Sequence, residues 1–187
     1  MKVGPPATAG QAAKVDARHQ TTAPFVWAIG GVVRRRRRAA CGSRDAVTLA
    51  EQLAGLEPAG PVGPPSRVIR LGPVELAWVG ASETTLKLED VPHFIGKSPF
   101  VANPRARIQD VRDGFVKLLV HAGSGRVLGA QIFGPGAGER IDEVALAIAL
   151  GAAAEDLARV ARAPGTLSEA LGEAARAACG WPMMLLR

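Results

Sequence analysis

Residues 114–133, which read GFVKLLVHAGSGRVLGAQIF, contain two apolar runs separated by a short connection. The runs, residues 114–120 and 127–133, have the length and the Val, Leu, Ile and Phe content that strands favour. The connection at residues 121–126 supplies the glycines that a tight reversal needs. The stretch therefore predicts a hairpin, and with it an antiparallel sheet.

The hydrophobic period changes downstream of this hairpin. Residues 139–150 and 155–161 place apolar side chains at helical spacing, with a glycine between the two segments. A last helix is predicted to begin at Thr166, whose hydroxyl is a suitable N-cap, and Glu169 three residues later completes a capping box. Strands followed by helices predict an α+β fold, an antiparallel sheet packed with helices.

Upstream of the hairpin, residues 68–79 and 96–103 are two further strand-like segments. Proline and glycine dominate residues 57–66, which are therefore predicted to be a linker. We expect one folded domain over residues 67–179 and a tail over residues 180–187.

The N-terminal third shows a weaker pattern. Residues 25–33, FVWAIGGVV, are predicted to form a buried strand that ends at a Gly-Gly turn, and residues 39–55 a helix. Together, residues 21–56 form a strand and helix unit. Residues 1–20 have no convincing period and are expected to be loosely ordered.

Composition indicates a globular protein whose excess charge is local. The 187 residues carry a net charge of +6, to which Arg34, Arg38 and the three arginines between them contribute five positive charges, so the remainder carries +1. No stretch stays apolar for the ~20 residues of a membrane helix, and the N-terminus lacks the apolar core of a signal peptide. A cytoplasmic protein without a membrane partner is the expectation.

Residues 162–171, RAPGTLSEAL, are similar to a catalytic motif. The segment resembles the His-Pro-Thr-x-x-Glu signature of dihydrolipoamide dehydrogenase and its flavoprotein disulfide reductase relatives, the pyridine nucleotide-disulfide oxidoreductases. In that family the His accepts a proton from the substrate dithiol, and the Glu orients the imidazole. The resemblance makes Glu169 the candidate catalytic residue, but Pro164 stands at the position of the base. Capping by Thr166 and Glu169 is the competing structural interpretation, and both roles can coexist.

The resemblance extends over about 110 residues. Residues 77–80, 99–106, 114–117, 125–129 and 167–170 are similar, in order and spacing, to landmarks of the family's dimerisation domain. The resemblance implies a homodimer, or a heterodimer with a full-length reductase, in which the surface around residues 139–178 meets its copy. The absence of a C-terminal vicinal cysteine pair favours the dihydrolipoamide branch over mercuric reductase-like relatives.

Residues 21–31, TTAPFVWAIGG, are similar to the family's second flavin motif. The resemblance implies that Gly30, Gly31 and Ala39 correspond to positions beside FAD. The family has an Asp at the position of Gly31, where its carboxylate binds the ribityl chain. The Gly-x-Gly-x-x-Gly fingerprint for NAD and the family's redox pair Cys-x4-Cys do not occur in this sequence. Residues 21–56 are thus interpreted as a remnant of the FAD-binding domain.

Three functions remain open. The first is a catalytically impaired dimerisation module, and the second is the C-terminal part of a split FAD-dependent NAD oxidoreductase completed by another chain. The third is nucleic-acid binding through Arg34 to Arg38, which is disfavoured because the charge is local and no aromatic residue interrupts it.

Other titratable groups provide little support for catalysis. His19, His93 and His121 are predicted to be loop or strand-flanking residues, and none adjoins Glu169 in the sequence. Cys41 and Cys179 have no metal-ligand or redox spacing, so no metal site is expected.

Overall fold

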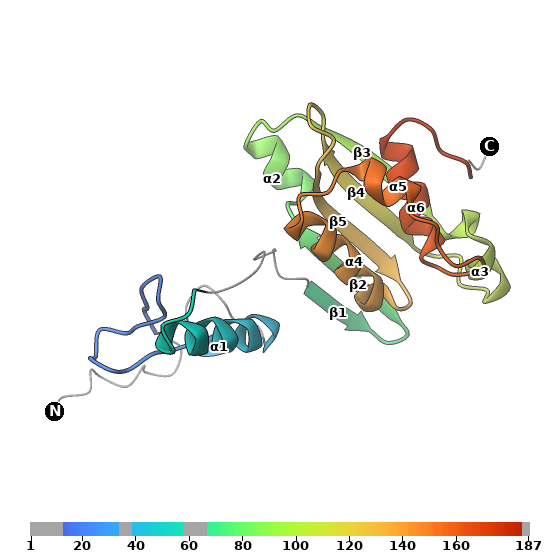
Figure 1. The fold of residues 1–187 in the computed structure, drawn as a ribbon. Helices are drawn as coiled ribbons and strands as arrows, with labels where there is room; N and C mark the ends of the chain where they lie inside the picture. Colours follow the sequence, from blue (N-terminus) through green and yellow to red (C-terminus); the bar gives the residue numbers. More distant parts are fainter. Residues whose placement is uncertain (1–12, 34–38, 58–66, 185–187) are drawn as a thin grey trace. The chain divides into compact units, whose positions relative to one another are not determined.

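The computed structural model describes residues 13–33, 39–57 and 67–184 (Figure 1). The chain divides into two compact units, Met1–Gly60 and Pro61–Arg187, which we call unit 1 and unit 2. The division lies between residues 60 and 61, within the segment that its proline and glycine content predicts to be a linker. The arginine run at residues 34–38 lies outside the described residues.

A five-stranded antiparallel sheet forms the centre of unit 2, with the strand order β1-β2-β5-β4-β3. Its strands are β1 (Arg67–Leu71), β2 (Val74–Gly80), β3 (His93–Pro99), β4 (Phe115–His121) and β5 (Val127–Gly134). The predicted hairpin is confirmed, because β4 and β5 pair with Phe115 opposite Phe133. Residues 68–79, predicted as one strand-like segment, form two paired strands reversed at Gly72, whose φ of +66° suits glycine.

Three helices cover one face of this sheet (Figure 1). They are α4 (Ala137–Ala149), α5 (Ala154–Arg159) and α6 (Glu169–Ala178), and together we call them the helix layer. Helix α4 packs on β2 and β5, α6 packs on β3 and β4, and α5 packs on α6. The predicted α+β class is confirmed.

The core lies between the sheet and the helix layer. Its fully buried side chains include Leu118 and Ile132 from the sheet and Ile141 and Leu171 from the helices. Gly96 of β3 allows α6 to approach, because a Cβ at this position would lie 2.7 Å from the Ala178 backbone nitrogen and even closer to the Ala174 carbonyl oxygen. The backbone of α6 therefore lies directly on that of β3.

The opposite face of the sheet has partly exposed aromatic rings beside its own cations. The guanidinium of Arg67 lies 5.8 Å from the ring centre of Trp78, and the Lys97 ammonium lies 4.8 Å from that of Phe115. Such pairs shield the aromatic faces from water and favour a solvated surface.

Short helices connect the strands at three points that the sequence analysis did not predict as helical. These are α2 (Glu83–Leu88), η2 (Phe100–Ala102) and α3 (Pro104–Ile108). Ser82 caps α2 by accepting the Thr85 N–H at 3.1 Å, and Asn103 caps α3 by accepting the Ala106 N–H at 3.0 Å. The predicted strand at residues 96–103 therefore begins earlier, at His93, and ends at Pro99, because the three residues after it form a 3-10 turn.

Unit 1 contains less regular structure. Its elements are η1 (Gly30–Val32) and α1 (Ala39–Leu53). The predicted helix is confirmed, and it ends at Leu53. Gly55, with φ +74°, follows the helix, and the Leu56 N–H bonds to the Glu51 carbonyl at 2.9 Å. The strand predicted at residues 25–33 is wrong, because this segment makes only isolated bridges, from Trp27 and Val33, before and after a 3-10 turn. A strand needs a continuous neighbour to pair with, and the described residues of unit 1 contain none.

Candidate functional site

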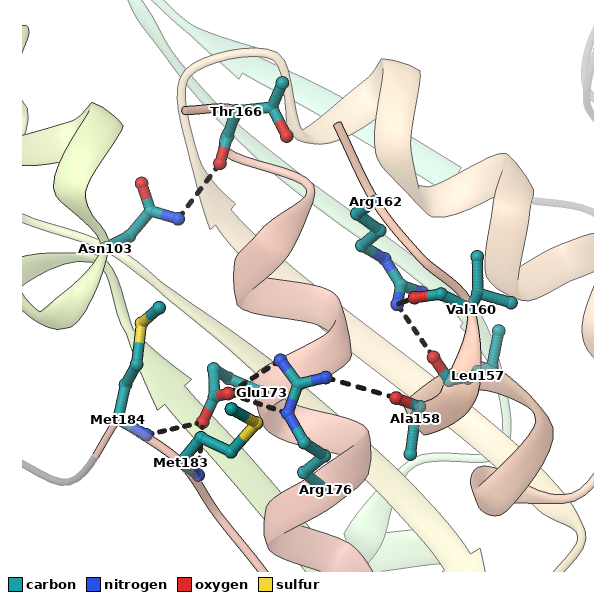
Figure 2. Close-up of polar contacts among 10 residues, drawn as sticks. All are labelled: Asn103, Leu157, Ala158, Val160, Arg162, Thr166, Glu173, Arg176, Met183 and Met184. Carbon is teal, nitrogen blue, oxygen red and sulfur yellow. Dashed lines mark hydrogen bonds and ion pairs between the residues drawn. The ribbon is translucent and has the colours of Figure 1, made fainter. Parts of the chain in front are cut away.

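The motif at residues 162–169 forms the connection between α5 and α6. Arg162 is the first residue of this motif. Its side chain is only 8% exposed and forms an ion pair with Glu143 of α4 at 2.6 Å. The same guanidinium donates to the Leu157 carbonyl at 2.7 Å (Figure 2). A Cβ on Gly172 would lie 2.7 Å from an Arg162 nitrogen, so this glycine provides the space in which Arg162 lies against α6. Arg162 therefore fixes the connection to all three helices.

Glu169 binds the backbone of its own loop. Its Oε2 accepts the N–H groups of Gly165 at 3.0 Å and Thr166 at 3.2 Å. The Thr166 hydroxyl donates to the Ala163 carbonyl at 2.9 Å instead of capping a helix. The predicted helix start at Thr166 is therefore wrong, since α6 begins at Glu169 and its N-cap position is Ser168. Of the predicted capping box, the half in which Glu169 accepts the Thr166 N–H is present.

The loop conformation is incompatible with the family's proline at position 165. Gly165 has φ +71°, which a proline ring cannot adopt. Proline there would also remove the N–H that Glu169 accepts. In this chain the Glu169 carboxylate therefore stabilises the turn at Gly165. Pro164 is exposed and has no side chain that could accept a proton.

The histidines of unit 2 bind elsewhere. His93 Nδ1 lies 2.8 Å from the Val91 carbonyl, and His121 Nδ1 accepts the N–H groups of Gly123 and Ser124 at 3.1 and 3.0 Å. These two histidines are paired across β3 and β4. Among the described residues, the hydrogen bonds of Glu169 include none from a histidine. His19 belongs to unit 1, where it is buried.

A second glutamate, which the sequence analysis did not single out, lies one turn further along α6. Glu173 is only 4% exposed, and its Oε1 pairs with the Arg176 guanidinium at 2.6 Å. Arg176 also donates to the Ala158 carbonyl of α5 at 3.1 Å. The other oxygen, Oε2, accepts the backbone N–H groups of Met183 and Met184 at 3.1 and 2.9 Å (Figure 2). The i,i+3 spacing of Glu173 and Arg176 signalled an ion pair, but not its burial.

These side chains surround a hollow of about 250 Å³ between the α5–α6 connection, α6 and the residues after α6. It is lined by Val160, Ala161, Arg162, Glu169, Glu173, Arg176, Met183 and Met184. Asn103 supports the loop from the side, because its amide donates to the Thr166 carbonyl at 3.0 Å (Figure 2). The arrangement holds the carboxylate of the motif in place and provides no neighbouring base.

The described thiol and the acidic groups give no sign of redox or metal chemistry. Burial raises the pKa of the Cys179 thiol, which lowers its thiolate fraction near neutral pH. No group of three or more His, Cys, Asp or Glu side chains suited to a metal occurs in the described part of the chain. None of the described helices is long and apolar enough to cross a membrane.

The candidate flavin positions of unit 1 do not fit the contact that the family makes. Gly30 is buried with φ +69°, and its Cα lies against Gly42 of α1. Gly31 is exposed and has no side-chain oxygen to accept a ribityl hydroxyl. Ala39 is the first residue of α1, which places it at the start of the helix that follows η1. The described residues thus retain the glycine turn of the motif without its carboxylate.

A five-stranded antiparallel sheet with a helix layer, whose last connection carries this motif, defines the chain as an oxidoreductase interface domain. Residues 68–175 match the model of the pyridine nucleotide-disulphide oxidoreductase dimerisation domain. The chain belongs to this family, whose members use FAD and NAD(P).

Relatives and solved structures support the same assignment. Over 164 residues the chain is 46% identical to mouse and 44% identical to human mitochondrial dihydrolipoyl dehydrogenase, which covers 88% of this chain and 32% of each relative. The structure of LpdA from Mycobacterium tuberculosis superposes with a TM-score of 0.82 at 25% identity, over 91% of this chain and 37% of that one. RclA from Escherichia coli, a flavoprotein disulfide reductase, shares the fold with a TM-score of 0.79 at 24% identity, over 86% of this chain and 37% of that one. The chain thus spans about a third of the length of the dehydrogenases that it matches, as a dihydrolipoyl dehydrogenase-like dimerisation domain.

Proposed function

We propose that this chain acts as a self-associating module and does not oxidise dihydrolipoamide by itself. The observation that supports the absence of catalysis is the geometry of Glu169. Its carboxylate accepts two loop N–H groups, and Pro164 occupies the position of the base. Proton abstraction from a dithiol needs a base that the site holds within hydrogen-bond distance of the substrate.

The proposed homodimer forms through the outer surface of the helix layer. Six apolar side chains are exposed on this layer and on the residues after α6. They are Leu146, Leu150, Val160, Trp181, Met183 and Met184. Exposed apolar groups of this kind favour burial in a contact. The opposite face of the sheet has Ile69 and Ile95 exposed, but the rings of Trp78 and Phe115 lie beside cations of the chain. A two-fold contact between identical surfaces gives a closed dimer, because neither copy keeps a free contact surface for a third.

Sedimentation velocity of the purified chain with added FAD tests this proposal, with protein and flavin absorbance recorded together. We expect a dimer that carries no flavin. A monomer at all concentrations would contradict self-association, and flavin that sediments with the protein would contradict the loss of the cofactor contact.

A second candidate function has its own support in unit 1. Several of its apolar side chains are exposed, which favours a partner that carries the remainder of a flavin domain. They are Phe25, Val26, Val32, Val47, Leu53 and Leu56. In this alternative the chain completes a split oxidoreductase or forms a heterodimer with a full-length reductase. Mixing the chain with a full-length dihydrolipoyl dehydrogenase tests it, because a heterodimer would sediment between the two homodimers while carrying flavin absorbance.

Nucleic-acid binding through Arg34 to Arg38 is the least supported alternative. Location in the cytoplasm remains a prediction that fractionation of cells can test.

A further inference from the structure

The residues after α6 are attached to the helix layer by one buried carboxylate. Both N–H groups bound by Glu173 Oε2 are backbone groups, so this attachment does not depend on the side chains of Met183 and Met184. Hydrogen bonds to an ionised acceptor are stronger than neutral ones. Because Arg176 neutralises the other oxygen and reaches α5, one network joins α5, α6 and the residues after α6.

We propose that residues 181–184, which we call the strap, supply part of the contact surface for a second copy of this chain, and that Glu173 holds the strap in place for this purpose. The inference rests on the proposed self-association. The dimerisation-domain match ends at residue 175, so Glu173 lies within the matched part and the strap lies beyond it.

The strap directs apolar side chains outward. The side chain of Met183 is 73% exposed, and Trp181 and Met184 are also exposed. Methionine is flexible and polarizable, which lets it fill an irregular contact. The strap begins where the Trp181 N–H bonds to the Arg176 carbonyl at 3.0 Å, after Gly180 with φ +85°. Its course is therefore fixed at both ends, by the helix end and by Glu173.

The surroundings of the strap favour an apolar occupant. The hollow that the strap borders has Val160, Met183 and Met184 on its apolar side. The two arginines that line it are already paired within the chain, Arg162 with Glu143 and Arg176 with Glu173. The Glu169 carboxylate, which also lines the hollow, accepts two loop N–H groups. A charged partner would thus find few charges that are not already bound within the chain, whereas an identical apolar surface is self-complementary about a two-fold axis.

Two variants remove the strap's contribution in different ways. In the first, a stop codon after Gly180 removes the strap together with residues 185–187. In the second, Met183→Glu places a charge on the strap while keeping the backbone bonds to Glu173. We expect each to raise the dimer dissociation constant about tenfold or more, as loss of a contact residue does. Leu88→Glu is the matched control, because Leu88 is an exposed side chain of α2, outside the helix layer.

A third variant, Glu173→Gln, tests the anchor by amide hydrogen exchange. We expect the Met183 and Met184 amides to be protected in the parent chain and in Met183→Glu, and to exchange faster in Glu173→Gln. If Glu173→Gln does not fold, the protection seen in Met183→Glu and the parent still decides whether the amides are bound.

The outcomes separate the two proposals. A parent dimer whose dissociation constant changes less than twofold in both strap variants would overturn the strap's role and leave self-association standing. A parent chain that stays monomeric would overturn both. Unprotected Met183 and Met184 amides in the parent would overturn the anchor whatever the association state.

Discussion

Unit 2 and unit 1 both resemble parts of the same reductase family, but they differ in how completely they bury their own apolar surface. Unit 2 has a continuous five-stranded ladder and a core in which Leu118, Ile132 and Leu171 are fully buried. Unit 1 has one helix and a 3-10 turn joined by isolated bridges, and apolar side chains such as Phe25 and Leu53 are exposed.

The difference indicates which of the two units can support the proposed association. Every strand of the unit 2 sheet has its neighbour within the unit, so the association surface is supported by a core of its own. The glycine turn of the flavin motif in unit 1 has no such sheet around it in the described residues. We therefore expect the proposed association to depend on unit 2, and stability changes to be far larger there than in unit 1.

The largest effect is expected for Gly96→Ala. Its new methyl group would overlap backbone atoms of Ala174 and Ala178, which cannot move without separating α6 from β3. We expect the free energy of unfolding to fall by more than about 3 kcal/mol, or the chain to fail to fold, because the overlap is with backbone and exceeds ordinary overpacking. Urea unfolding measures it, and Gly31→Ala is the control, because nothing lies within 4 Å of the added Cβ. If both substitutions lowered the free energy of unfolding equally, the proposed difference in packing between unit 2 and unit 1 would be contradicted.

A cavity in the core should lower the free energy of unfolding slightly less than the clash created by Gly96→Ala. Leu171→Ala removes a fully buried side chain from α6, and we expect a destabilisation of about 3 kcal/mol. The same substitution at exposed Leu53 of α1 should change stability by less than about 1 kcal/mol. Thermal and urea unfolding of the two variants provide the comparison, and a larger loss at Leu53 would show that unit 1 has a core of its own.

Restoring the family's motif should weaken the loop and leave the chain inactive. Pro164→His combined with Gly165→Pro forces a proline at φ +71° and removes one N–H bond to Glu169, for an expected cost of about 1–3 kcal/mol. We expect no NAD-linked oxidation of dihydrolipoamide by this variant alone. Pro164→His alone, which keeps Gly165, is the stability control. Turnover by either variant without a partner chain would contradict the proposed function.

The smallest effect concerns a surface ion pair of unit 2. Hydrogen bonds from Lys117 and then Lys87 lower the pKa of Glu83 from its ordinary 4.5 to about 2. A carboxyl group whose pKa is lower in the folded state stabilises the fold above its unfolded pKa, and that contribution is lost as the pH falls. The stability difference between the parent chain and Glu83→Gln should thus shrink as the pH falls from about 4.5 to about 2. A difference that stays constant over this range would show that the ion pair does not contribute.

The sequence predicted those elements whose pairing partners are close in the chain. The β4–β5 hairpin was predicted from two apolar runs joined by a glycine-containing connection, α4 and α5 from helical spacing, and α6 from a capping box, all of which are local signals. Residues 25–33 show why an apolar run alone is insufficient, since it forms a strand only beside another strand. Helices α2 and α3 were overlooked although Ser82 and the Asn103-Pro104 pair mark their starts.

The candidate site was predictable to a smaller extent. The motif identified Glu169 and the missing base, because both follow from residue types at fixed spacing. The acceptance of loop N–H groups by Glu169 depends on the left-handed turn at Gly165, which no periodicity encodes. The burial of Glu173 depends on contacts with α5 and with residues ten and eleven positions later, so it emerges only from the tertiary structure.

The outer surface of the helix layer is proposed to bring two copies of the chain together. Sedimentation equilibrium of Leu150→Glu, compared with Leu88→Glu and the parent chain, tests it most directly, because both leucines are exposed and only Leu150 borders this surface. We predict that Leu150→Glu shifts the chain to monomers while Leu88→Glu remains dimeric like the parent. An unchanged dimer in Leu150→Glu, or dissociation in Leu88→Glu alone, would contradict the claim.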